Sequence, residues 1–128
     1  MNYTYNKTLR MDFDQASKKV REALQSEGFG IITEVDLKDK FKEKLNVDFH
    51  RYTILGACNP KMAYEAVQQE EYIGVMLPCN VLLSEKSPGT IDVAAINPLA
   101  SIGGTGNDQL KPIAEQVGQK LQSAMEKL

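Results

Sequence analysis

The chain has 128 residues, of which 42% are hydrophobic and 25% charged, and its formal net charge is −2. These values suit one globular domain with its own core over residues 1–128, and they exclude the basic surface that nucleic-acid or anionic-membrane binding needs. No run approaches the ~20 apolar residues of a membrane helix, and the N-terminus lacks the apolar stretch of a signal peptide, which predicts a cytoplasmic protein with reduced thiols.

The first half of the chain predicts strands alternating with helices. Residues 3–9 alternate in polarity, as a half-polar strand does. Asp12 and Gln15 predict the capping box of an amphipathic helix that ends at Gly28. A second strand over residues 29–35, a short amphipathic helix carrying Leu37, Phe41 and Leu45, and a third strand over residues 49–57 are expected next.

The second half predicts a helix, two strands and a final helix. Asn59 and Pro60 form a helix start, because asparagine favours the N-cap and proline the first helical position. Residues 73–83 are the strongest strand candidate, apolar on both faces, but Pro78 makes this strand an edge strand, or one bulged or broken there. Residues 90–96 predict a fifth strand, residues 97–107 a glycine-bearing loop, and Asp108 the cap of a last amphipathic helix.

This order of elements predicts an α+β fold. Strands that follow one another at hairpin distance pair antiparallel, and two long amphipathic helices on one face of such a sheet make two layers. We found no repeat and no interdomain linker in the sequence.

Both cysteines of the chain stand before an asparagine and beside a proline, as Cys58-Asn59-Pro60 and Pro78-Cys79-Asn80. If the third and fourth strands are neighbours, the two turns converge, and we expect Cys79 to face Cys58 at any site there. Cys58, Asn59, Cys79 and Asn80 are therefore the candidate ligand-binding residues.

Three interpretations of these turns stay open. The preferred one is a small-molecule-binding or interaction module whose pocket lies beside the turns, since no catalytic set is complete. The second is a thiol-dependent redox or transfer protein that uses Cys58 as nucleophile and Cys79 as resolving thiol, because Cys58 precedes a helix start, where thiol pKa values fall. The third is purely structural, since most free cysteines are simply buried. The sequence does not decide whether the protein is an enzyme.

Other chemistries find little support. Two thiolates leave a tetrahedral metal site incomplete, and a continuous strand would hold His50 about 26 Å from Cys58, so no metal or cofactor is expected and His50 is assigned to the surface or to a dimer contact. No serine elbow is present. The loop from Gly103 to Gly106 lacks the lysine and serine of a phosphate cradle and is expected to be a connector or a lid.

The blocks Gly56-Ala57-Cys58-Asn59-Pro60 and Leu77-Pro78-Cys79-Asn80 resemble the domain-of-unknown-function 302 family, and the resemblance covers nearly the whole chain. It implies a TATA-binding-protein-like fold of strand, helix, four strands and helix, and a homodimer. The family's usual Asp-Pro is Asn97-Pro98 here, which removes one possible carboxylate. No activity comes with the resemblance.

Overall fold

The computed structural model describes residues 2–128 and contains one five-stranded antiparallel sheet in the order β1-β5-β4-β3-β2. The predicted α+β class is confirmed: the chain order is strand, helix and four strands closed by a helix, with short helical insertions. The strands are β1 (Thr4–Arg10), β2 (Gly30–Asp36), β3 (Tyr52–Cys58), β4 (Cys79–Ser87) and β5 (Thr90–Ile96).

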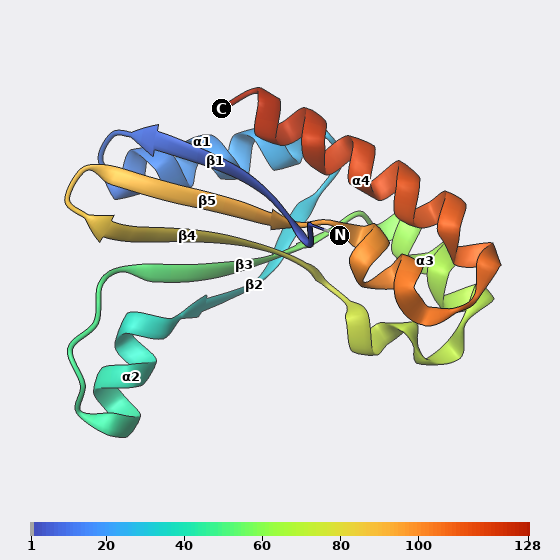
Figure 1. The fold of residues 1–128 in the computed structure, drawn as a ribbon, viewed down its shortest axis with the longest axis horizontal. Coiled ribbons are helices and arrows are strands. Elements are labelled where there is room, and N and C mark those ends of the chain that lie inside the picture. The colour runs from blue at the N-terminus through green and yellow to red at the C-terminus, as the bar shows by residue number, and fades with distance from the viewer. Residues whose placement is uncertain (1) are drawn as a thin grey trace.

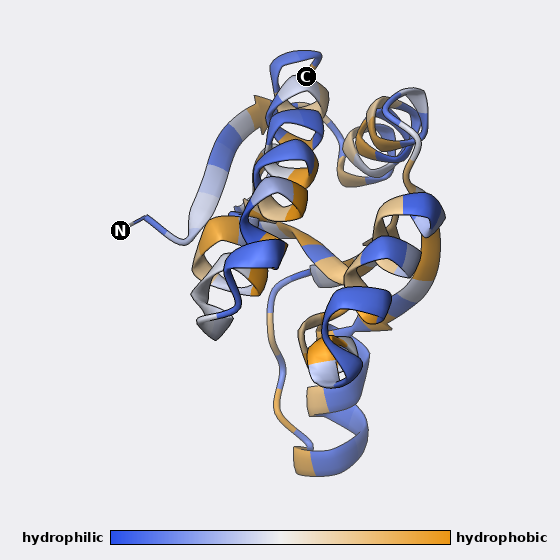
Figure 2. Ribbon diagram, turned by 90° about the vertical axis from the view of Figure 1, so that its right-hand side faces the viewer, coloured by the Kyte–Doolittle hydropathy of each residue, from blue (hydrophilic) through white to orange (hydrophobic). Residues whose placement is uncertain are grey.

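Two long helices, α1 (Phe13–Ser26) and α4 (Lys111–Glu126), cover the same face of the sheet (Figure 1). The buried residues of α1 recur at helical spacing from Phe13 to Leu24, as expected of an amphipathic helix, and those of α4 recur from Ile113 to Met125. In the turned view of Figure 2, α4 has hydrophobic residues on one side and hydrophilic residues on the other. The core therefore lies between this helical layer and the inner sheet face, where Leu55, Val81 and Val93 are fully buried.

The helix ends follow from local chemistry, with two corrections to the predicted caps. Asp12 caps α1, but its carboxylate accepts from the amide of Asp14 at 2.7 Å and not from that of Gln15. Gly28 follows the end of α1 with φ of +88°, as predicted. Asp108 does not cap α4; it begins a 3-10 turn, and Asn107 caps that turn by accepting from the amide of Gln109.

Three predicted segments differ in structure. Residues 46–51 are irregular, so β3 starts later than expected. Residues 73–83 do not form one strand: Glu71–Met76 is a 3-10 helix, η1, and β4 begins after Pro78. The strand is thus broken at the proline, and β4 is the middle strand of the sheet, so the edge-strand alternative is wrong.

The remaining helices are α2 (Leu37–Leu45), α3 (Pro60–Gln69) and three single 3-10 turns, η2 (Pro98–Ala100), η3 (Ile102–Thr105) and η4 (Asp108–Leu110). Of the residues of α3, only Ala66 is buried. Helix α2 has no buried residue and lies apart from the other helices (Figure 1). Within residues 2–128, none of the helices has the length and apolarity needed to cross a membrane.

Candidate functional site

The end of β3 and the start of β4 place the two Cys-Asn turns at the same end of the sheet, which we call the cysteine end. The two strands are neighbours, as predicted, and their register pairs Ala57 with Cys79 and Gly56 with Asn80. Cys79 therefore lies opposite Ala57, and the expectation that it faces Cys58 is wrong. Both cysteines are free thiols.

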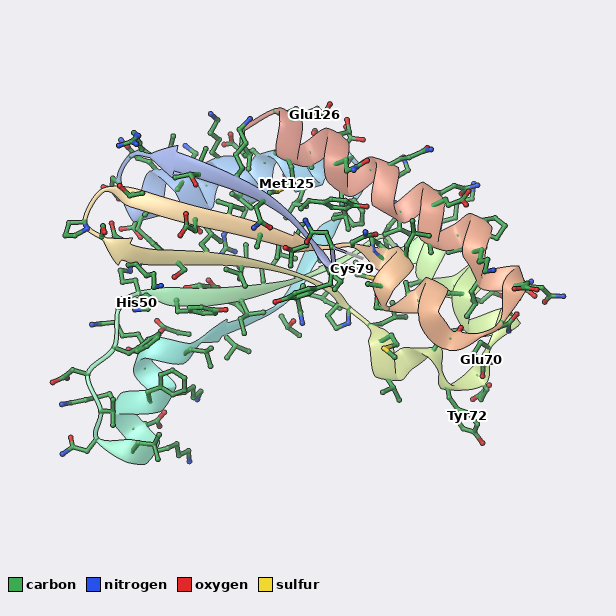
Figure 3. The ribbon with its side chains drawn as sticks, viewed as in Figure 1. His50, Glu70, Tyr72, Cys79, Met125 and Glu126 are labelled. Carbon is green, nitrogen blue, oxygen red and sulfur yellow. The ribbon has the colours of Figure 1, made fainter. Side chains whose placement is uncertain are left out.

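The inner side of the cysteine end contains a small apolar cavity between the sheet, α3 and α4. Cys79 is buried here, between the sheet and the helices (Figure 3). The cavity volume is about 20 Å³. A single water needs about 10–15 Å³, so the space holds one water-sized group. Its lining is Phe29, Ala57, Cys58, Asn59, Met62, Ala63, Ala66, Leu77, Pro78, Cys79, Ile102, Ile113 and Val117.

The Cys79 thiol is protonated at neutral pH. Burial, and secondarily the neighbouring Cys58, raise the pKa of Cys79 to about 11. Desolvation disfavours the charged form, and a nearby second thiolate would repel it. Since the thiolate is the nucleophile in disulfide exchange, Cys79 is poorly suited to the role of a resolving thiol.

The two asparagines of the turns have different structural roles. The Asn59 side chain caps α3 by accepting from the amide of Met62 at 3.3 Å, and its amide group packs against Gly28. Asn80 is exposed and directed to the opposite face of the sheet from Cys79, because neighbouring side chains in a strand alternate. The four candidate residues therefore do not form one pocket: Cys58, Asn59 and Cys79 line the inner cavity, and Asn80 does not.

The local shape at the cysteine end depends on Gly56. A Cβ at this position would lie 2.7 Å from Cγ of Pro78, and it would also meet the side chain of Thr33 on β2. The ring of Pro78 thus packs against the backbone of β3 at the point where β4 begins. A larger residue at position 56 would therefore displace Pro78 or Thr33.

The face of the sheet opposite α1 and α4 carries an apolar stripe, which sequence reasoning did not identify. The register aligns Ala94, Leu82, Ile54 and Val35 across four strands. An open groove of about 180 Å³ runs beside the stripe and includes Asn80. We call this surface the outer face; its groove is lined by Tyr3, Thr4, Ile54, Asn80, Leu82, Ala94, Ala95 and Ile96.

The DUF302 family model, described as a domain of unknown function, matches residues 5–128. The chain belongs to the DUF302 family. It is similar to the uncharacterized conserved DUF302 protein from Bacillus stearothermophilus, whose crystal structure superposes with a TM-score of 0.90 at 24% identity, over 99% of this chain and 98% of that one. No curated protein matches the sequence. At this identity the crystal structure supports the fold of this DUF302 chain and says nothing of its chemistry.

The only histidine of this DUF302 chain lies away from the cysteine end of the sheet. His50 and Cys79 lie at opposite ends of the sheet (Figure 3). His50 Nε2 lies 3.0 Å from Oγ of Ser84 on the outer face, and its ring stacks on Phe49 with centroids 3.9 Å apart. Among the described residues, no group of three or more His, Cys, Asp or Glu side chains is arranged to hold a metal ion.

The glycine-bearing loop of the DUF302 chain is folded into the 3-10 turns η2 to η4. Ile102 and Leu110 anchor it by full burial, and Ile102 also lines the inner cavity. Asn107 ties it to the end of α3 through a hydrogen bond to the carbonyl of Gln69 at 3.1 Å. These contacts are those of a packed connector.

Proposed function

We propose that the protein is a non-enzymatic interaction module that binds a protein partner through the outer face of its sheet. The observation that carries the proposal is the apolar stripe of Ala94, Leu82, Ile54 and Val35, which no helix of the described chain covers. An uncovered apolar surface that spans several strands and is rimmed by polar residues marks an interaction site in soluble proteins.

The composition of the outer face favours an apolar partner. By register and alternation, the described strands direct few charged side chains to it: Arg10 on β1, Asp92 on β5 and Lys86, two residues after Ser84, on β4. A surface with so few charges, and of both signs, attracts the phosphates of a nucleic acid or a lipid headgroup weakly. The groove of about 180 Å³ is also smaller than the ~300–1,000 Å³ that small-molecule pockets enclose, which favours a broad protein contact.

The other two predicted functions receive less support. A cavity of about 20 Å³ beside Cys58 and Cys79 is far below the size of a metabolite pocket. The raised pKa of Cys79 counts against thiol exchange. A small ligand beside the Cys-Asn turns and a redox role stay predictions, and the structural interpretation accounts for Asn59 as a helix cap.

Site-specific photocrosslinking in cells tests the proposal. A benzoylphenylalanine in place of Asn80, an exposed residue on the outer face, is expected to give a covalent adduct of defined mass. The same probe in place of Val75, which is 85% exposed on η1, is the matched control and should not give that adduct. Leu82→Asp in the probe-bearing chain should suppress it. A missing adduct at position 80, or an equal one at position 75, would contradict the proposal.

A further inference from the structure

The two edges of the sheet differ in how regularly they are built. Strands β1 and β2 are the edge strands. The pairing of β2 with β3 shifts its register between Ile31 and Thr33, whereas β1 pairs with β5 without a shift over all seven of its residues. β1 also contains no proline. A register shift blunts an edge against further pairing, so β1 is the edge that an additional strand can join.

Two hydrogen bonds fix the direction of the backbone groups of β1. The amide of Asn97 donates to the carbonyl of Tyr3 at 2.7 Å, and the amide of Met11 donates to the carbonyl of Gly89 at 3.1 Å. The odd-numbered residues of β1 are therefore the ones that exchange hydrogen bonds with β5. Because the two kinds of residue alternate along an antiparallel strand, the even-numbered residues of β1 direct their N–H and C=O groups to the free edge.

The free edge presents these groups mainly at Asn6 and Thr8, which are both exposed. The amide of Thr4 points the same way, but it already donates to Oδ1 of Asn2 at 3.2 Å. Exposed N–H and C=O groups in this alternating row are the template on which another strand pairs.

An open groove of about 460 Å³ lies between this edge and the C-terminal half of α4. Asn6 and Lys7 line it from β1, and Gln122, Met125 and Glu126 line it from α4. Figure 3 shows Met125 and Glu126 near the end of α4, beside β1. The volume lies within the ~300–1,000 Å³ of ligand sites, and the groove combines an unpaired strand edge with a helical wall.

We propose that this groove binds an extended peptide segment of a partner protein, which adds to β1 as a further strand beside α4. The peptide backbone exchanges hydrogen bonds with Asn6 and Thr8, and every second side chain of the peptide faces α4. In such strand addition the main-chain bonds supply affinity and the alternate side chains supply specificity. This site is distinct from the apolar stripe of the outer face and takes a ligand of different chemistry.

The walls of the groove favour a peptide with uncharged polar side chains. Lys7 and Glu126 are of opposite sign, so they select neither an acidic nor a basic segment. The side-chain amides of Asn6 and Gln122 offer both donors and acceptors. A second hollow of about 320 Å³ shares Tyr5 and Gln122 with the groove and continues it along α4, which gives room for a segment longer than the groove alone.

Selection from a displayed library of random ten-residue peptides on the purified full chain supplies the probe, and fluorescence anisotropy of the enriched peptide measures its affinity. Asn6→Pro removes an amide that β5 does not use, so the sheet keeps its ladder while the peptide loses a hydrogen bond and meets the proline ring. The affinity should fall about tenfold or more. Asn6→Ala, which keeps the amide, is the matched control and should retain most of the affinity. Circular dichroism checks that both variants are folded.

Two further measurements do not depend on a change in β1. Gln122→Trp places a bulky side chain in the groove and should weaken binding, whereas Gln116→Trp, at an exposed position on the same helix outside the groove, should not. N-methylation of the peptide amides one by one should weaken binding at alternate positions only, because a strand directs every second amide to its neighbour. A library that enriches no peptide overturns the proposal. A peptide that tolerates Gln122→Trp or folded Asn6→Pro, or an N-methyl scan without alternation, overturns it too.

Discussion

Raising the pH from 7.5 to 10.5 should destabilise the protein through Cys79. The folded chain keeps this thiol buried beside the inner cavity, where its pKa is about 11, against 9.0 for a free thiol. Ionising it in place would put a charge among apolar side chains with almost no water. The unfolded chain releases the proton freely, so alkaline pH favours unfolding.

The sign and size follow from the two pKa values. Below pH 9 both states hold the proton and the thiol contributes no pH dependence. Between pH 9 and 11 only the unfolded state loses it, so the free energy of unfolding falls by about 1.4 kcal/mol per pH unit. The full loss is about 3 kcal/mol once pH exceeds the folded pKa. This is a large share of the 5–15 kcal/mol that holds a typical domain together.

Urea unfolding followed by circular dichroism at several pH values, in wild type and in Cys79→Ala, isolates this effect. Lysines and tyrosines also titrate in this range, but they do so in both proteins, so the difference between the two curves reports Cys79 alone. Cys58→Ala is the matched control: it removes the lesser cause of the raised pKa and should keep most of the pH dependence. Parallel curves for wild type and Cys79→Ala from pH 7.5 to 10.5 would refute the reasoning.

Further substitutions test the packing of the sheet and of α3, each by urea unfolding. Gly56→Ala should cost about 1–3 kcal/mol because its Cβ meets Pro78 and Thr33, and Thr33→Ala should recover part of that loss; a neutral Gly56→Ala would show that the close approach is wrong. Asn59→Ala should cost about 1 kcal/mol through the lost cap of α3, and no change would mean that the cap is not formed. Leu83→Ala, at a fully buried position on β4, should cost about 2–5 kcal/mol, and a cost below 1 kcal/mol would contradict its place in the core.

The sequence predicted the fold best where two independent signals agreed. The fifth strand was predicted over its observed range, Thr90–Ile96, because a turn and an apolar alternation marked its limits together. The start of α3 was likewise marked by both an N-cap asparagine and a first-turn proline. Residues 71–76 failed because a short apolar run has no decisive period, and only Pro78 signalled the break.

The sequence also contained a signal about the site that the predictions did not use. Adjacent residues in a strand point to opposite faces, so Cys79 and Asn80 could not line one pocket once β4 included both. The same alternation could have identified the outer face, since Ile54, Leu82 and Ala94 are apolar although their neighbours fill the core. What the sequence could not supply was the register that aligns these three residues across three strands.

The two Cys-Asn turns look alike because proline begins the next element in both, but it begins different elements. After Cys58 and Asn59, Pro60 takes the first position of α3, where its missing amide costs nothing, and Asn59 is left to cap the helix. Before Cys79, Pro78 stands just outside β4, where no ladder hydrogen bond is needed from it. Antiparallel pairing then brings the end of β3 beside the start of β4, so both cysteines border one cavity as a consequence of topology. Their place on one cavity therefore requires no shared chemistry, whereas the apolar stripe across the outer face has no such explanation from folding, and the proposed function rests on that stripe.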